Sequence, residues 1–296
     1  MHIWRIFKLR ALFCYFSATG NTKKCVDLYQ ECLHSYGVES YIHNIDNGKL
    51  EFDPEDYDMV FFAYPIHGFN APENVLKFAK TLKRCKEKKR LIILKTSGEH
   101  LRINNISSYS LRRILKRRNY YLTNEYHYIM PYDIIFRHTD LMAYNMYEAL
   151  KGLVPLDVRD ILDNKIVKLK YMPFGHLLQL IMLIEHPGAK INGLFMHTNK
   201  NCISCGLCVK ACPTKNIILN DKGKIQFKHN CLMCTRCAFY CPKDAIVFGL
   251  FNSWKVNGKY SFQMPKEEEI DKHKRYCKNS YKRYFKIAEE RIKNQK

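Results

Sequence analysis

Two cysteine runs in the second half of the chain constrain its fold more than any other feature. The runs are Cys202-x2-Cys205-x2-Cys208-x3-Cys212-Pro213 and Cys231-x2-Cys234-x2-Cys237-x3-Cys241-Pro242. Each has the spacing of bacterial [4Fe–4S] sites, in which an x2 gap places successive thiolates around one cubane within a tight turn. Together the runs supply eight thiolates, enough for two such clusters. The spacing therefore predicts a protein that moves electrons.

The second run is a copy of the first. Cys202 corresponds to Cys231, Pro213 to Pro242 and Ile217 to Ile246, all at one offset. This internal repeat resembles the bacterial 2[4Fe–4S] ferredoxins, in which the fourth cysteine of each run binds the cluster of the other run. The resemblance implies one cluster on Cys202, Cys205, Cys208 and Cys241, and a second cluster on Cys212, Cys231, Cys234 and Cys237.

Zinc and disulfides are the alternatives for these cysteines. Structural zinc sites usually take two separated cysteine pairs, whereas three cysteines at successive x2 gaps followed by Cys-Pro, repeated, do not suit two tetrahedral zinc sites. Arg5, Lys8 and Arg10 interrupt the first apolar stretch, so we predict no secretory leader. Residues 174–184 form an apolar stretch too short for a transmembrane segment. We therefore expect a cytoplasmic protein, whose thiols bind metal rather than form disulfides.

The amino-terminal half alternates apolar runs with helix-compatible segments. Strands are predicted at 11–16, 38–45, 57–63, 90–95 and 120–129, and helices at 22–36, 72–83 and 111–118. This alternation favours an α/β fold, a doubly wound sheet of five parallel strands. Ligands of such sheets bind beyond the carboxyl ends of the strands, where loops 17–22, 64–70 and 96–100 should meet.

The first of these loops has the composition of a phosphate site. The segment Ser17-Ala18-Thr19-Gly20-Asn21-Thr22 leads from a strand into a helix, whose amino end presents unpaired N–H groups and a positive dipole end. Hydroxyl groups can add donors, and Gly20 allows a close approach of the backbone. A Walker loop is excluded, because no lysine follows a second glycine.

This loop matches the phosphate loop of flavodoxins, T/S-x-T-G-x-T. With the two cysteine runs behind it, the whole chain resembles the EFR1-family ferredoxins, which are described by a flavodoxin-like part followed by a two-cluster ferredoxin. The resemblance implies a flavodoxin-like sheet domain, a small α+β 2[4Fe–4S] ferredoxin-like domain, and FMN beside two [4Fe–4S] clusters. The implied flavin contacts are Ser17, Ala18, Thr19, Gly20, Asn21, Thr22, Tyr64, Pro65, Ile66, His67, Gly68, Phe69, Ser97 and Gly98. Tyr64 is the favoured flavin-covering aromatic, with Phe69 second.

Four parts of the chain follow from these features. They are a flavodoxin-like FMN-binding domain (1–130), a mostly helical linking segment (131–194), the ferredoxin-like domain (195–250) and a basic, helical tail (251–296). Linking helices are expected at 140–152, 157–168 and 174–185, the last closed by Pro187-Gly188. The segment is expected to pack between domains, with a dimer interface or peripheral membrane contact as alternatives. In the tail, Tyr281, Tyr284 and Ile287 share one helix face.

The formal net charge of the chain is +21. Such a charge attracts acidic proteins, nucleic acid or anionic membranes. The basic residues are spread over 77–90, 112–118 and the segment after Lys255, which does not form one nucleic-acid stripe. We therefore expect a redox protein as the partner and no nucleic acid. Two interpretations of the charge stay open: it attracts an acidic face of that partner, or it is a lysine-rich background whose side chains are solvated and have no specific role.

These features favour an electron carrier that passes electrons between two [4Fe–4S] clusters and FMN. One alternative is an enzyme, a flavin-dependent reductase of a small substrate that is fed by its own clusters. Another is a binding module with structural clusters and a basic surface. The sequence has no second nucleotide fingerprint, so a protein donor is favoured over a nicotinamide. Enzyme or carrier, and the oligomeric state, stay open at this point.

Overall fold

The structure is a computed structural model that describes residues 8–170, 172–266 and 278–294. Its first part is a five-stranded sheet in the order β2-β1-β3-β4-β5, with every neighbouring pair parallel. The strands are β1 (Arg10–Tyr15), β2 (Glu39–Asn44), β3 (Met59–Pro65), β4 (Lys89–Ser97) and β5 (Tyr120–Ile129). The predicted fold class is confirmed, and strand bounds differ from the prediction by no more than two residues.

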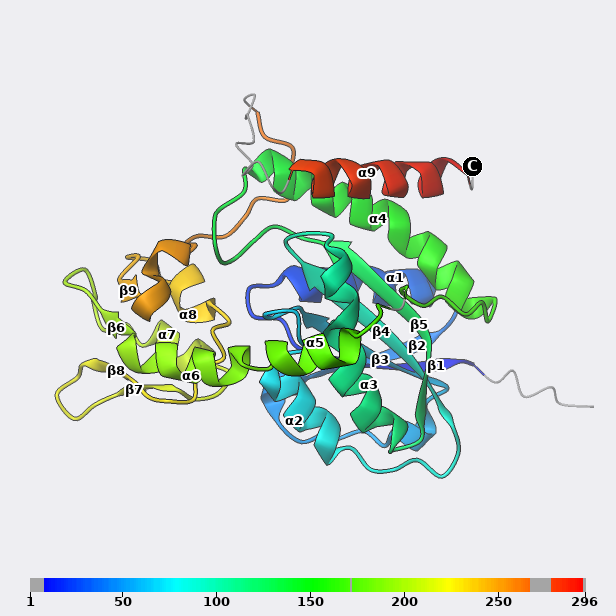
Figure 1. The fold of residues 1–296 in the computed structure, drawn as a ribbon, viewed down its shortest axis with the longest axis horizontal. Coiled ribbons are helices and arrows are strands. Elements are labelled where there is room, and N and C mark those ends of the chain that lie inside the picture. Colours follow the sequence, from blue (N-terminus) through cyan, green and yellow to red (C-terminus); the bar gives the residue numbers. More distant parts are fainter. Residues whose placement is uncertain (1–7, 171, 267–277, 295–296) are drawn as a thin grey trace, which may run out of the picture.

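Helices cover both faces of this sheet (Figure 1). On one face lie α1 (Asn21–Ser35), α4 (Asp140–Leu162) and α9 (Lys278–Lys293), and on the other α2 (Glu73–Thr81) and α3 (Tyr109–Lys116). Side chains alternate along β1, so that Phe13 faces the first layer while Leu12 and Cys14 face the second. Burial on both faces explains why β1, β3 and the centre of β4 read as continuous apolar runs. Short 3₁₀ helices are η1 (Ile45–Asn47), η2 (Pro54–Asp56), η3 (Arg102–Ser108) and η4 (Gly249–Trp254).

The segment after β5 differs from its prediction. The helices expected at 140–152 and 157–168 are one helix, α4, which runs through Pro155. Proline removes a backbone hydrogen bond and normally breaks a helix. Here Val154, Val158 and Ile161 are buried in the core, where α4 packs against α1. Tertiary packing therefore keeps the helix continuous through a residue that local signals treat as a boundary.

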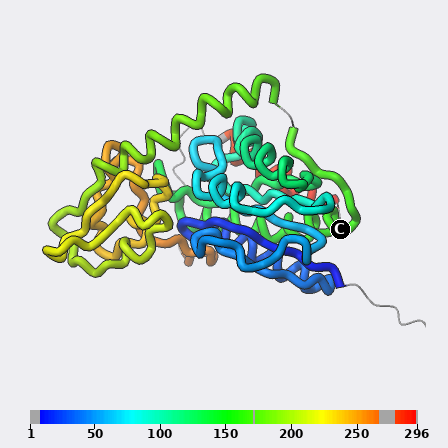
Figure 2. The backbone as a smooth tube through the Cα atoms, turned by 90° about the horizontal axis from the view of Figure 1, so that it is seen from below, coloured from blue at the N-terminus to red at the C-terminus, as the bar shows by residue number. Residues whose placement is uncertain are grey.

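The next two helices form a rod that spans the molecule. The apolar segment expected at 174–185 is α5 (Gly175–Met182), and α6 (Glu185–Phe195) follows it. The expectation that Pro187-Gly188 ends the helix is wrong. Pro187 lies in the first turn of α6, where its missing N–H has no helical partner to lose. In Figures 1 and 2, α5 and α6 lie in one line along the outside of both domains.

The carboxyl-terminal helix belongs to the sheet domain. Within the expected tail, residues 267–277 and 295–296 lie outside the described residues. Helix α9 packs on α4, and Tyr281 and Tyr284 of the predicted face are buried. Ile287 is instead 44% exposed, and Ala288 occupies the buried position. In the described parts of the chain, no helix has the length and apolar character needed to cross a membrane.

The cysteine runs fold into a small α+β unit. Its strands pair antiparallel, β6 (His197–Thr198) with β9 (Ile246–Val247) and β7 (Ile217–Leu219) with β8 (Ile225–Phe227). Each run includes a short helix, α7 (Leu207–Ala211) or α8 (Arg236–Phe239). The repeat is visible in the backbone, because left-handed residues occur at corresponding positions: Ser204 and Met233, Gly206 and Thr235, Lys215 and Asp244. Both runs therefore trace the same path.

Candidate functional site

The loop between β1 and α1 is held from its carbonyl side by the second cysteine run. Arg236 donates from Nε to the carbonyl oxygen of Ala18 at 2.8 Å and from Nη2 to that of Ser17 at 2.7 Å. The Tyr240 hydroxyl donates to the carbonyl oxygen of Thr19 at 2.7 Å. These bonds join the expected phosphate loop to the cysteine-rich domain. They use carbonyl oxygens of the loop and not its N–H groups.

Some polar groups of this loop stabilise the loop itself. The Thr22 hydroxyl is buried and lies 2.8 Å from the Thr96 hydroxyl, which links the first loop to the third. The Ser17 hydroxyl accepts a hydrogen bond from the backbone N–H of Lys23 at 3.2 Å. Gly20 has a φ of 104°, so it makes the left-handed turn into α1 that other residues rarely adopt.

The remaining polar side chains of the loop bind the segment that follows β5. The Thr19 hydroxyl donates to Oδ2 of Asp133 at 2.6 Å, and the Asn21 amide donates to the carbonyl oxygen of Pro131 at 2.8 Å. Burial raises the pKa of Asp133 to about 6, while the hydrogen bond from Thr19 acts in the opposite direction. A carboxyl group thus engages a donor that a phosphate would need.

A cavity of about 530 Å³ opens at the carboxyl edge of the sheet, beside this loop. The three loops expected to meet there all contribute to its wall. The predicted contacts that line it are Ala18, Thr19, Asn21, Pro65, Ile66, His67, Gly68, Phe69, Ser97 and Gly98; Ser17, Gly20, Thr22 and Tyr64 do not. The volume falls within the range of roughly 300 to 1,000 Å³ typical of cofactor sites. Size, position and the adjoining helix terminus therefore fit FMN, and we refer to this space as the flavin cavity.

Residues of the linking segment form much of the remaining wall. A Cβ atom on Gly98 would lie 2.3 Å from the Tyr132 ring, and one on Gly68 would lie 2.5 Å from Cγ of Glu185. Tyr132 and Glu185 therefore press directly on two cavity loops. The sequence interpretation missed these residues and Asp133, because none belongs to a motif. The loop after β5 could have been suspected, since β5 ends at the same edge of the sheet as the other strands.

The prediction that the Tyr64 ring covers the flavin is wrong. Tyr64 has no exposed surface and packs in the core layer beneath α2 and α3. The physical reason is that β3 continues to Pro65, so alternation along the strand turns Tyr64 inward. Phe69, the second choice, lines the flavin cavity, together with Tyr132 and Trp254.

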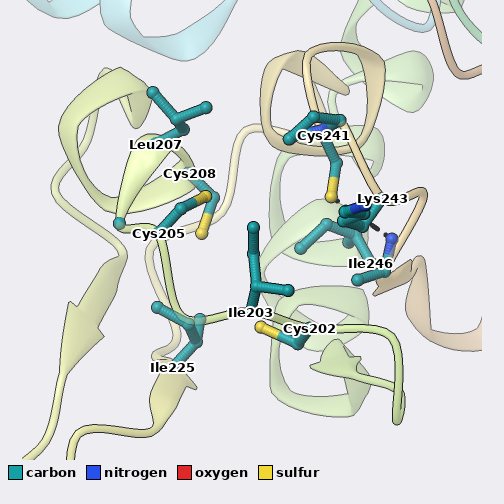
Figure 3. Close-up of a pocket in the computed structure, with 12 residues that line it drawn as sticks. Cys202, Ile203, Cys205, Leu207, Cys208, Ile225, Cys241, Lys243 and Ile246 are labelled. Carbon is teal, nitrogen blue, oxygen red and sulfur yellow. Dashed lines mark hydrogen bonds between the residues drawn. The ribbon is translucent and has the colours of Figure 1, made fainter.

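Four cysteines surround a separate cavity near the surface of the cysteine-rich domain. This outer cysteine site consists of Cys202, Cys205, Cys208 and Cys241. Figure 3 shows their side chains around one space, with Ile203 and Ile246 close by. The backbone N–H of Ala245 donates to Sγ of Cys241 at 3.2 Å, and Cys205 is exposed.

The other four cysteines surround a second cavity. This inner cysteine site consists of Cys212, Cys231, Cys234 and Cys237. Backbone N–H groups donate to Sγ of Cys212 and to Sγ of Cys231, each at 3.2 Å. Burial raises the pKa of the Cys231 thiol to about 11 and that of Cys234 to about 12. The crosswise grouping implied by the repeat is the grouping in which these side chains come together.

The geometry bears on the zinc alternative. Within residues 8–170, 172–266 and 278–294, no three His, Cys, Asp or Glu side chains are placed to hold a single metal ion. Tetrahedral zinc needs sulfurs about 2.3 Å from one centre. A cubane instead binds four thiolates around a larger body, and four cysteines line each of the two cavities. The residues therefore fit iron–sulfur clusters.

One residue joins the inner cysteine site to the flavin cavity. Cys234 lines both spaces, and its neighbour Met233 also lines the flavin cavity. The outer cysteine site shares no lining residue with the flavin cavity. Among the described residues, the inner site is thus the one in direct contact with the flavin cavity.

Comparisons with known families agree with this division of the chain. A model of the flavodoxin domain matches residues 12–117, and a model of the 4Fe-4S dicluster domain matches residues 198–246. The chain is therefore an electron-transfer protein of the flavin and iron–sulfur class. More particularly, it is a flavodoxin domain followed by a 4Fe-4S dicluster domain, which confirms the layout that the resemblance implied.

Solved flavodoxins are among the structures similar to the first domain. Flavodoxin 1 from Bacillus cereus is 13% identical, with a TM-score of 0.38 over 51% of this chain and 97% of its own. The flavodoxin of Megasphaera elsdenii is 13% identical, with a TM-score of 0.35 over 40% of this chain and 85% of its own. Rubredoxin oxygen:oxidoreductase from Desulfovibrio gigas is 15% identical, with a TM-score of 0.35 over 53% of this chain and 37% of its own. No curated protein matches the chain.

Proposed function

We propose that this chain carries electrons along one internal route, between a [4Fe–4S] cluster at the outer cysteine site, a second at the inner cysteine site, and FMN. The observation that carries the proposal is the position of Cys234, which lines the inner cysteine site and the flavin cavity alike. A cluster on this residue would lie against the flavin without an intervening layer of protein. The outer site, with Cys205 exposed, is the place where a partner exchanges electrons.

The residues of the chain divide the work among themselves. Clusters supply single electrons and FMN accepts one or two, so the pair converts one-electron exchange into two-electron exchange. The N–H groups at the start of α1 would hold the FMN phosphate. Phe69, Tyr132 and Trp254 would exclude water from the ring system. Arg236, anchored on the phosphate loop, fixes the second cysteine run against the flavin domain.

The partner of the outer site is proposed to be a redox protein with an acidic face. Lys200, Lys210 and Lys243 are exposed on the cysteine-rich domain, and Lys243 also lines the outer cysteine site. Opposite charges on two surfaces speed encounter and fix orientation. The basic character of this region therefore supports docking of an acidic protein close to Cys205.

Cofactor content is the first test. The protein is purified without oxygen, and flavin, iron and sulfide are counted per chain. The proposal expects about one flavin, with iron and sulfide near eight each from two cubanes. Iron near eight without any flavin, even after incubation with FMN, would reduce the proposal to a ferredoxin.

Electron flow is the second test. The holoprotein is reduced at its clusters by a limiting amount of a protein reductant, and flavin and cluster absorbance are followed together. The proposal expects the clusters to reoxidise as the flavin is reduced. Clusters that never exchange electrons with the flavin would overturn the route and favour the binding-module alternative. Rapid reoxidation by a small organic acceptor, but not by any protein, would favour the reductase alternative.

A further inference from the structure

The rod formed by α5 and α6 has an apolar face turned to the outside. We call it the α5–α6 ridge. Its side chains recur three or four positions apart, as one helix face requires. They are Phe174, Leu177, Leu180, Ile181, Ile184, Ile191, Leu194 and Phe195, with exposed fractions from 50% to 83%. Soluble single chains rarely expose a continuous apolar surface of this extent unless it binds something.

The opposite face of the rod is polar and buried, so the ridge cannot turn inward. The Gln179 side chain donates to Asn70 at 2.6 Å and accepts from Ser110 at 2.9 Å, all three being buried. In α6, the Asn192 side chain accepts the backbone N–H of Leu250 at 2.8 Å and donates to the carbonyl oxygen of Phe248 at 3.3 Å. Releasing these buried groups would leave them unpaired, which is costly.

A basic groove lies beside the rod. It is a cavity of about 430 Å³ between α2, α3 and the α5–α6 junction. Its cationic lining residues are Lys77, Lys80, Arg113 and Arg117. The carboxylate that lines it, Glu73, is bound to Lys77 at 3.0 Å and to Lys190 at 2.9 Å. Arg113 and Arg117 are exposed at its rim, which leaves a positive excess beside the apolar ridge.

We propose that the α5–α6 ridge and the basic groove together bind the surface of an anionic phospholipid bilayer. Apolar side chains of an interfacial helix enter the boundary between headgroups and acyl chains, and lysine and arginine beside them bind the lipid phosphates. The ridge supplies the apolar side chains and the groove supplies the basic ones. The rod spans both domains, so the protein would lie flat on the membrane (Figure 2).

A second copy of the chain fits this surface less well. Ridge-to-ridge packing would bring two basic grooves close together, in a chain whose formal charge is already +21. Like charges that face each other across an interface disfavour association. A bilayer with negative headgroups satisfies the apolar ridge and the groove at once.

The test is co-sedimentation of the full-length holoprotein with lipid vesicles. Vesicles of phosphatidylcholine with about one third phosphatidylglycerol should bind it at least about 10-fold more strongly than pure phosphatidylcholine. Leu177→Asp combined with Ile181→Asp should weaken binding to the anionic vesicles by about 10-fold or more. Arg113→Glu combined with Arg117→Glu should abolish the preference for anionic lipid.

Matched controls separate the surface from general hydrophobicity and charge. Ile166→Asp changes an apolar residue that is 68% exposed outside the ridge. Lys222→Glu with Lys224→Glu makes the same charge change on exposed residues of the cysteine-rich domain. Both controls should bind like the parent protein, with unchanged flavin and iron content.

Three results would overturn the proposal. The first is a parent protein that stays in solution with anionic vesicles. The second is ridge variants that retain cofactors and bind as well as the Ile166→Asp control. The third is a dimer, seen by analytical ultracentrifugation without lipid, that the ridge variants convert to monomers. None of these results bears on the proposed electron route, which is tested through the cofactors.

Discussion

The two cysteine sites share one sequence pattern and one backbone path, yet their surroundings differ. The outer cysteine site has Cys205 exposed and Lys243 at its edge. The inner cysteine site is enclosed by apolar side chains such as Met196 and Phe248, and Cys234 faces the flavin cavity. Two copies of one sequence pattern thus lie in different surroundings, and in the proposed route the outer site, the terminal, would exchange electrons with a partner while the inner site, the relay, would pass them to the flavin.

Corresponding positions in the two runs show how the difference arises. Arg236 and Tyr240, which bind the phosphate loop, correspond at the repeat offset to Leu207 and Ala211. Leu207 is 49% exposed. Two side chains in one copy therefore dock that copy onto the flavodoxin domain, while their counterparts leave the other copy facing solvent.

The largest expected effect comes from removing one ligand of each cluster. Cys234→Ser and Cys205→Ser should each lower iron from about eight to about four per chain. Only Cys234→Ser should slow reduction of the flavin by the remaining cluster, by about 100-fold or more, because the relay beside the flavin is lost. Anaerobic stopped-flow absorbance measures this rate. Equal flavin reduction in the two variants would break the distinction between relay and terminal.

The second effect is on the docking of the inner site. Arg236→Ala removes the bonds to the phosphate loop. It also removes the ion pair between Arg236 and Asp46 at 2.7 Å, in which the two side chains are only 14% and 13% exposed. We expect a loss of about 3 kcal/mol of unfolding free energy, because Asp46 loses its partner. Anaerobic denaturant titration gives the value. The matched change Leu207→Ala should cost well under about 1 kcal/mol, and equal losses would contradict the asymmetry.

The third effect is on the affinity for FMN, through Asp133 beside the expected phosphate loop. The pKa of Asp133 is raised to about 6 by burial, so the carboxyl is neutral below that pH and negative above it. FMN affinity of the parent should therefore fall as pH rises through about 6, and Asp133→Asn should bind about 10-fold more tightly at pH 8.

Fluorescence titration of the flavin-free protein measures this affinity. The phosphate of FMN titrates in the same range, so riboflavin, which lacks that phosphate, serves as the control and should show little gain from Asp133→Asn. An unchanged ratio of FMN affinities between parent and variant from pH 5 to pH 8 would show that Asp133 moves away when FMN binds.

The smallest effect concerns the outer terminal. Lys210→Glu with Lys243→Glu should slow electron exchange with an acidic ferredoxin or similar acidic donor about 10-fold at low salt. The difference should vanish at high salt, because exposed charges are screened. Lys222→Glu with Lys224→Glu is the charge-matched control. Equal slowing by both pairs would mean that the whole basic surface, rather than the region of Cys205, steers the partner.

Local sequence signals predicted the elements of the sheet domain well. The central strands β1 and β3 are continuous apolar runs because both of their faces are buried, and β5 (Tyr120–Ile129) has the bounds that were expected. The errors concern residues whose role depends on a distant contact. Pro155 sits inside a helix because the core holds α4 together, and Tyr64 is core because its strand is longer than its apolar run. Asp133 and Tyr132 reach the flavin cavity from a segment without any motif.

By itself, the sequence determined the chemistry and the order of the parts. Cysteine spacing specifies clusters because three of the four ligands of each site lie within one short run, and a strand, hydroxyl-rich loop and helix specify a phosphate site because they too are adjacent in the sequence. Only the tertiary structure decided which cluster site adjoins the flavin cavity, which carboxyl group meets the phosphate loop, and which face of α5 and α6 stays exposed. These features join residues as far apart as Ala18 and Arg236, and no local pattern records a contact across that separation.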